Sequence, residues 1–139
     1  MNDQQLITML REKGFKVTPQ RLAICRFVLS SNEHPSVEKI YDKIQKVYPT
    51  ISLATIYQTL HLLTKIGLLQ EFALCNGSLR YDSNISPHLN LICKNCGKII
   101  DYESEKINMF LSEIAKELEL PLVGQHLELY IYCNQCKSN

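Results

Sequence analysis

The stretch "SLATIYQTLHLLTKIGLLQEFALCNGSLRYDS", residues 52–83, changes within one segment from a helical pattern to a strand pattern. Its first half predicts a helix that starts at Ser52 and stops at Gly67, because apolar residues recur at helical spacing at positions 53, 56, 60 and 63. Its second half predicts two strands, "LLQEFAL" and "LRYDS", since the Asn76-Gly77 pair between them is a strong hairpin-turn signal. The segment is therefore expected to be a helix followed by a β-hairpin.

Three further helices are predicted upstream of this segment. The first covers residues 3–13, the second begins at Pro19 with Thr18 as its N-cap, and the third begins after Ser36 and is broken by Pro49. The third helix has an apolar side formed by Val37, Ile40, Tyr41, Ile44 and Val47. Helices followed by a two-stranded hairpin are typical of a winged helix-turn-helix, in which the last helix enters the DNA major groove.

The charge is distributed unevenly along the chain. The formal net charge is +1, but residues 1–82 carry ten Lys/Arg against seven Asp/Glu (+3), whereas residues 83–139 carry five against seven (−2). The fourth helix is expected to turn small, polar, hydrogen-bonding side chains outward, namely Ser52, Thr55, Gln58 and Thr59. Such a face is also typical of solvated surface, so this helix alone leaves DNA binding and an ordinary surface both open.

The composition is that of an ordinary soluble globular protein, with 45% hydrophobic and 21% charged residues. The sequence has no run of about 18 apolar residues, which argues against a membrane span. The N-terminal stretch has an acid at Asp3 and lacks the basic start, apolar core and cleavage site of a signal peptide. A cytoplasmic location is expected.

The second half of the chain predicts a small α/β unit. Residues 89–103 and 126–136 have strand patterns, and residues 104–119 between them predict a helix. The apolar side of that helix consists of Ile107, Phe110, Leu111, Ile114 and Leu118. A unit of this size buries little surface alone, so a partner subunit or a metal is expected to complete it.

Four of the six cysteines have the spacing of a zinc site. Cys93-x-x-Cys96 and Cys133-x-x-Cys136 are separated by 36 residues, and each pair lies where a strand meets a turn. Two such knuckles suit a tetrahedral structural zinc held by four thiolates. Disulfides and a thioredoxin-like redox motif are the alternatives. A cytoplasmic setting argues against disulfides, and the redox motif expects its C-x-x-C at the start of a helix.

Other potential metal ligands lie at the junctions of the predicted elements. Any one alone is more often a cap, a surface group or a satisfied histidine, and only their common placement favours a ligand role. They are His34, Asp82, His88, Asn90, Asp101 and His126. The two remaining cysteines lack ligand spacing: Cys25 is expected in the core, and Cys75 is expected at a turn as an exposed bystander.

Several motifs in the correct order resemble the ferric uptake regulator superfamily over essentially the full chain. They are "TPQR" at 18–21, "HP" at 34–35, "SLATIYQTL" at 52–60, "RYD" at 80–82, "CKNCGKIID" at 93–101 and "LELYIYCNQC" at 127–136. The resemblance implies a homodimeric α+β repressor that binds operator DNA. Its winged-helix DNA-binding domain would cover residues 1–83, and its zinc-stabilised α/β dimerisation domain residues 84–139.

Within that superfamily, the chain is most similar to the peroxide-sensing regulators. By this resemblance, the four C-x-x-C cysteines hold structural zinc, and a regulatory metal between the domains is bound by His34, Asp82, His88 and Asp101. The two aspartates favour this branch over the iron-uptake branch, which tends to use glutamate. In the peroxide-sensing branch, bound ferrous iron reacts with hydrogen peroxide and a ligand histidine is oxidised, with His34 and His88 as the candidates here. An iron, manganese or zinc uptake regulator without peroxide sensing is the alternative.

Two positions depart from the pattern of the superfamily. Its usual H-x-H unit reads His88-Leu89-Asn90, and the neutral amide oxygen of Asn90 is a harder and weaker donor than imidazole. This change tilts the regulatory site towards Mn²⁺ or Fe²⁺. Gln125 stands where some relatives have a histidine of an additional metal site, and His126 points to the other face by strand alternation. The additional site is therefore expected to be absent or altered.

DNA contacts are expected from Arg21, Ser52, Thr55, Tyr57 and Gln58, with Lys16 and Arg80 as phosphate contacts. Two other classes of protein remain open. An enzyme, such as a thiol oxidoreductase or a zinc hydrolase, would need an open zinc position or a low-pKa thiol, whereas four cysteines close the coordination shell. A zinc-stabilised protein-interaction module would need no helix-turn-helix.

Overall fold

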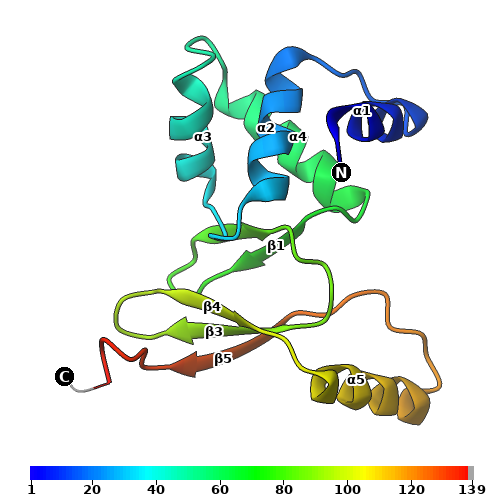
Figure 1. The fold of residues 1–139 in the computed structure, drawn as a ribbon, viewed down its shortest axis with the longest axis vertical. Coiled ribbons are helices and arrows are strands. Elements are labelled where there is room, and N and C mark those ends of the chain that lie inside the picture. Colours follow the sequence, from blue (N-terminus) through cyan, green and yellow to red (C-terminus); the bar gives the residue numbers. More distant parts are fainter. Residues whose placement is uncertain (138–139) are drawn as a thin grey trace. The chain divides into compact units, whose positions relative to one another are not determined.

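The computed structural model describes residues 1–137 and divides into two compact units, residues 1–85 and the residues from Ser86 onward. The first unit contains four helices and a two-stranded hairpin, the order of a winged helix-turn-helix (Figure 1). Its elements are α1 (Asp3–Glu12), α2 (Pro19–Ser30), α3 (Val37–Gln45), α4 (Leu53–Lys65), β1 (Gln70–Ala73) and β2 (Leu79–Asp82). The predicted α+β fold class is confirmed.

Side-chain caps determine where the helices of the first unit begin. The Thr18 hydroxyl accepts a hydrogen bond from the main-chain N–H of Arg21 at 3.2 Å, and Ser36 caps α3 in the same way. The Ser52 hydroxyl accepts from the N–H of Thr55 at 3.1 Å. These oxygens satisfy first-turn N–H groups that have no partner within the helix. The predicted starts of α2, α3 and α4 are confirmed.

The buried side of α4 differs from the prediction at two positions. Leu53, expected inside, is 48% exposed, whereas Thr59, expected outside, is fully buried. Position 59 lies three residues after Ile56 and four before Leu63, so it belongs to the same helical face as these two buried residues. The Thr59 hydroxyl donates to the main-chain carbonyl one turn earlier at 2.8 Å, which satisfies it inside the core.

An aliphatic core formed by all four helices holds the first unit together. Its largest fully buried side chains include Leu10, Ile24, Ile40, Ile56, Leu60 and Leu63. Val47, expected on the apolar side of the third helix, is 70% exposed because α3 already ends at Gln45. The hairpin joins this core through Tyr81 of β2, which is 2% exposed.

The second unit is built on a three-stranded sheet in the order β4-β3-β5. Its elements are β3 (Leu89–Cys93), β4 (Ile99–Tyr102), α5 (Glu105–Leu118) and β5 (Leu127–Ile131). Residues 89–103 were expected to be one strand, but they form the β3–β4 hairpin. Gly97 turns the chain back at φ +76°, and the Cys93 N–H donates to the Lys98 carbonyl at 2.9 Å. β5 pairs parallel with β3, with α5 in the connection between β4 and β5.

The apolar side of α5 is largely uncovered. Figure 1 shows α5 beyond the end of its sheet, not laid across it. Ile107 is 7% exposed, whereas Phe110 and Leu118 are each 54% exposed. Neither α5 nor any other helix in residues 1–137 combines the length and apolarity needed to cross a membrane.

Candidate metal centres

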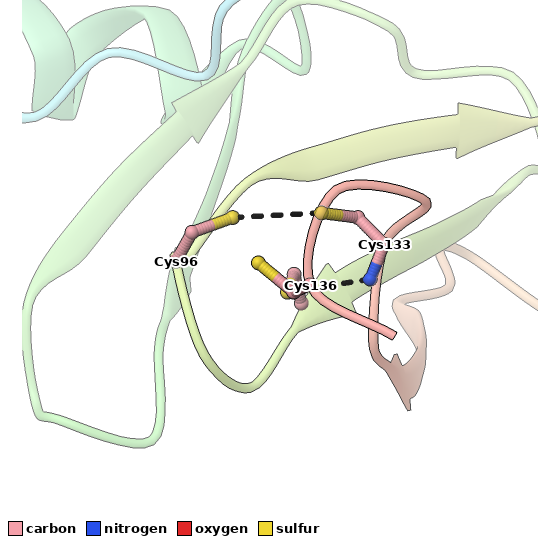
Figure 2. Close-up of side chains that lie close together, drawn as sticks. Cys96, Cys133 and Cys136 are labelled. Atoms are coloured by element: carbon pink, nitrogen blue, oxygen red, sulfur yellow. Dashed lines mark hydrogen bonds between the residues drawn. The ribbon is translucent and has the colours of Figure 1, made fainter. Parts of the chain in front are cut away.

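Four cysteine sulfurs converge in the second unit. Cys93 ends β3, Cys96 lies in the β3–β4 turn, and Cys133 and Cys136 follow β5. The four Sγ atoms all lie within 4.8 Å of one another. Figure 2 shows the sulfurs of Cys96 and Cys133 turned towards each other, and they lie 3.8 Å apart. Thiolates about 2.3 Å from a tetrahedral ion are separated from each other by about 3.8 Å. The cluster therefore has the dimensions of a zinc site.

The Cys93 thiol is biased towards the thiolate form that a metal requires. Hydrogen bonds from the main chain at Cys96 and then at Cys133 lower its pKa to about 6, and the N–H of Cys133 lies 3.4 Å from its sulfur. By contrast, burial in the aliphatic core raises the pKa of Cys25 to about 11. Cys25 is thus a core residue, as predicted, and Cys75 is exposed at the hairpin turn, also as predicted.

A histidine and an aspartate lie together inside the first unit. His34 belongs to the loop between α2 and α3 (residues 31–36), and Asp82 ends β2. The His34 Nε2 atom lies 3.3 Å from Asp82 Oδ2, and both side chains are buried. The N–H of Asn84 donates to the other carboxylate oxygen, Oδ1, at 2.9 Å. The Asp82 carboxylate is therefore fixed with its Oδ2 atom towards the imidazole.

A second histidine and aspartate lie together in the second unit. His88 precedes β3 and Asp101 lies on β4, with His88 Nε2 4.0 Å from Asp101 Oδ1. The Nδ1 atom of His88 lies 2.7 Å from the carbonyl oxygen of Ser86. Because a carbonyl only accepts, Nδ1 carries the proton and the lone pair of Nε2 can bind a metal.

Asn90 lies between two acidic residues in the sheet of the second unit. The register pairs Asn90 with Asp101 on β4 and with Glu128 on β5, and directly opposite residues project to the same face. Asn90 is 2% exposed, and within residues 1–137 its Oδ1 atom has no hydrogen-bond partner. An unpaired buried amide oxygen is costly unless it serves as a ligand. Glu128 was not among the predicted site residues, because its place beside Asn90 depends on the strand register.

His126, the residue before β5, contacts a side chain of that strand. The His126 Nε2 atom lies 2.6 Å from Glu128 Oε1, and the Tyr130 hydroxyl donates to the other oxygen of that carboxylate at 2.8 Å. Gln125, at the position of a histidine in some relatives, lines a pocket with Pro87 and Asn108. That the additional metal site is absent or altered stays a prediction.

The predicted DNA contacts fall into two groups. On α4, Tyr57 is 48% exposed and Gln58 is exposed, whereas the hydroxyls of Ser52 and Thr55 lie 3.0 Å apart at the helix cap. Among the cations, Lys16 is exposed. Two arginines bind main-chain carbonyls: Arg21 Nη1 donates to Lys16 at 2.6 Å, and Arg80 Nη1 donates to His34 at 2.8 Å. These roles in DNA binding stay predictions, and the contact between Arg80 and His34 was missed because it depends on the tertiary fold.

Residues 12–130 match the model of the Ferric uptake regulator family. The chain is 34% identical over 136 residues to the peroxide-responsive repressor PerR of Staphylococcus aureus strain Mu50, covering 97% of this chain and 91% of that protein. It resembles the crystal structure of the Campylobacter jejuni peroxide stress regulator with a TM-score of 0.77 and 32% identity, covering 94% of this chain and 98% of that one.

A structure of the ferric uptake regulator from Pseudomonas aeruginosa with manganese matches with a TM-score of 0.78 and 27% identity, covering 91% of this chain and 96% of that one. The resemblance predicted from the sequence motifs, including the likeness to peroxide-sensing regulators, is confirmed.

Proposed function

The chain belongs to the Ferric uptake regulator family, and on this basis we propose that it is a metal-dependent, DNA-binding repressor that responds to peroxide. The relatives named as peroxide-responsive repressors support this proposal, since they cover nearly the whole chain. The winged-helix unit would bind the operator, and the unit from Ser86 onward would form a homodimer. The half-exposed apolar side of α5 supports the dimer, because Phe110 and Leu118 are ordinarily covered in a folded assembly.

Structural zinc is the first metal of this proposal. Convergence of four sulfurs within 4.8 Å supports it. Four thiolates close the coordination shell, so no position remains open for a substrate or water. Cys93 is also only 1% exposed, which argues against the thiol oxidoreductase alternative, because a redox thiolate must be accessible.

A regulatory metal ion is the second metal of this proposal. Each unit supplies one imidazole nitrogen and one carboxylate oxygen, from His34 and Asp82 and from His88 and Asp101. Two nitrogens with several oxygens suit Fe²⁺ or Mn²⁺ better than they suit tight Zn²⁺ binding. The unpaired buried Oδ1 atom of Asn90 supports its role as a further, neutral donor.

Regulation would follow from the distribution of these ligands along the chain. Because His34 and Asp82 belong to one unit and His88 and Asp101 to the other, shared ligation would restrict the angle between the units. The restricted conformer would be the one in which the two recognition helices of a dimer match successive major grooves. Bound ferrous iron supplies reactivity towards hydrogen peroxide, and oxidation of His34 or His88 would remove a ligand and release DNA.

The observation that carries the proposal is the presence of two histidine–aspartate pairs, with both histidines and Asp82 buried, in addition to a separate four-cysteine cluster. The test is a duplex-binding titration across salt concentrations with protein purified without oxygen. Metal-dependent, salt-steep binding is expected, since Lys and Arg release counterions from the phosphates. Peroxide should release DNA from the Fe²⁺ form and not from the Mn²⁺ form, with oxidised peptides containing His34 or His88 by mass spectrometry. Equal insensitivity of both forms would instead support an uptake regulator, and metal-independent binding would refute regulation by metal.

A further inference from the structure

Strand β2 is tied to the loop that carries His34. The Arg80 Nη1 atom donates to the main-chain carbonyl of His34 at 2.8 Å. The N–H of Tyr81 donates to the carbonyl of Pro35 at 3.1 Å, so two successive residues of β2 bind two successive residues of the loop. A third hydrogen bond, from the Ser83 hydroxyl to the Ser31 carbonyl at 3.2 Å, attaches the first residue of the loop. The strand that ends in one proposed ligand therefore holds the backbone of another.

The backbone of His34 has an unfavourable conformation that these hydrogen bonds can stabilise. Its φ is 51°, in the left-handed region that residues other than glycine rarely adopt. Rotation of this backbone towards the common region would carry the imidazole away from Asp82 Oδ2, which lies 3.3 Å from its Nε2 atom. A charged guanidinium is a strong donor to the His34 carbonyl, and Arg80 is partly buried while it makes this bond.

We propose that Arg80 is a positioning residue for the regulatory metal, and not a phosphate contact. Its guanidinium holds the left-handed backbone of His34 so that the imidazole faces Asp82 before any ion binds. The inference rests on the proposed metal-dependent regulation and adds a residue to it. Outer partners of metal ligands typically contribute about 10- to 100-fold in metal affinity, which is the scale expected here.

The experiment is a calorimetric titration of zinc-loaded full-length protein with Mn²⁺ in the absence of DNA. Arg80→Met should weaken Mn²⁺ binding by about tenfold or more, since outer-partner substitutions cost that much. Arg80→Lys, which keeps one donor, should recover part of this loss. Arg11→Met, at an exposed arginine of α1, removes the same charge away from the loop and should leave the Mn²⁺ midpoint unchanged. Zinc content should be the same in all four proteins.

A second measurement separates positioning from phosphate contact. At saturating Mn²⁺, the salt dependence of DNA binding should be the same for Arg80→Met and the wild type. The proposal would be overturned if Arg80→Met bound Mn²⁺ as tightly as the wild type while the slope of its log DNA affinity against log salt fell by about one. That combination is the signature of a lost phosphate contact. Failure of the wild type to bind Mn²⁺ would instead remove the proposed function, and the role of Arg80 with it.

Discussion

The two units differ in the interactions that can stabilise each of them internally. The first buries aliphatic side chains from four helices, including Ile40 and Leu60 at 0% and 1% exposure. In the described part of the second, the buried hydrophobic side chains are Ile92, Ile107 and three of the clustered cysteines. Aliphatic burial stabilises the first unit directly. The second unit buries too little aliphatic surface. Its folding is therefore expected to depend on a metal bound by its thiolates and on a partner subunit that covers α5.

The largest effect is therefore expected from removing one of the proposed zinc ligands. Cys96→Ser should abolish zinc binding, unfold the second unit and disrupt the dimer, since structural zinc sites contribute about 10–16 kcal/mol of apparent binding free energy. Zinc content and sedimentation measure both outcomes. Cys75→Ser, at the exposed hairpin turn, is the matched control. A stable zinc-free dimer of Cys96→Ser would remove the contrast between the units.

Truncating the aliphatic core should destabilise the first unit and leave the proposed zinc site of the second unit intact. Leu60→Ala should lower the free energy of unfolding of the first unit by about 2–5 kcal/mol, because it leaves a cavity among buried side chains. Zinc content should stay at the wild-type value. Leu53→Ala makes the same change at a half-exposed position of the same helix and should cost much less. Denaturant unfolding followed by circular dichroism provides the measurement, and equal losses for the two variants would contradict a core at position 60.

The second unit contributes ligands to both proposed metal sites, and the two sites should respond independently. His88→Ala removes the imidazole beside Asp101 and should abolish the response of DNA binding to Mn²⁺ while zinc is retained. His61→Ala, at an exposed position of α4, is the control for loss of a histidine and should keep the Mn²⁺ response. Loss of zinc from His88→Ala would show that one site supports the other.

The smallest effect is expected at Asn90. Asn90→His replaces a neutral amide oxygen with imidazole, a better donor for divalent first-row ions, and should lower the Mn²⁺ midpoint for DNA binding. A gain of roughly 1.4 kcal/mol corresponds to about tenfold. An unchanged midpoint, alongside loss of response in His88→Ala, would place Asn90 outside the coordination shell. The site would then be completed by water or another side chain.

Local spacing explains what could be predicted from the sequence. Helix starts depend on one side chain and the N–H two or three residues later, so Thr18, Ser36 and Ser52 were identified from the sequence alone. The hairpin turn at Asn76-Gly77 depends on a single left-handed glycine, at φ +85°. The C-x-x-C spacing likewise identified four cysteines that the structure then brings within 4.8 Å. Their role as zinc ligands stays a prediction.

Only the tertiary structure decided the features that depend on distant residues. Residues 89–103 fold back as a hairpin because the turn between Cys93 and Lys98 closes, which strand patterning does not encode. Glu128 lies beside Asn90 through the parallel register of β5, and Arg80 reaches the His34 carbonyl across 46 positions of chain. Periodicity reports which side of an element is apolar, but not which partner meets it. The sequence therefore determined the elements and the candidate ligands, and the tertiary structure determined which residues lie beside those ligands and hold them in place.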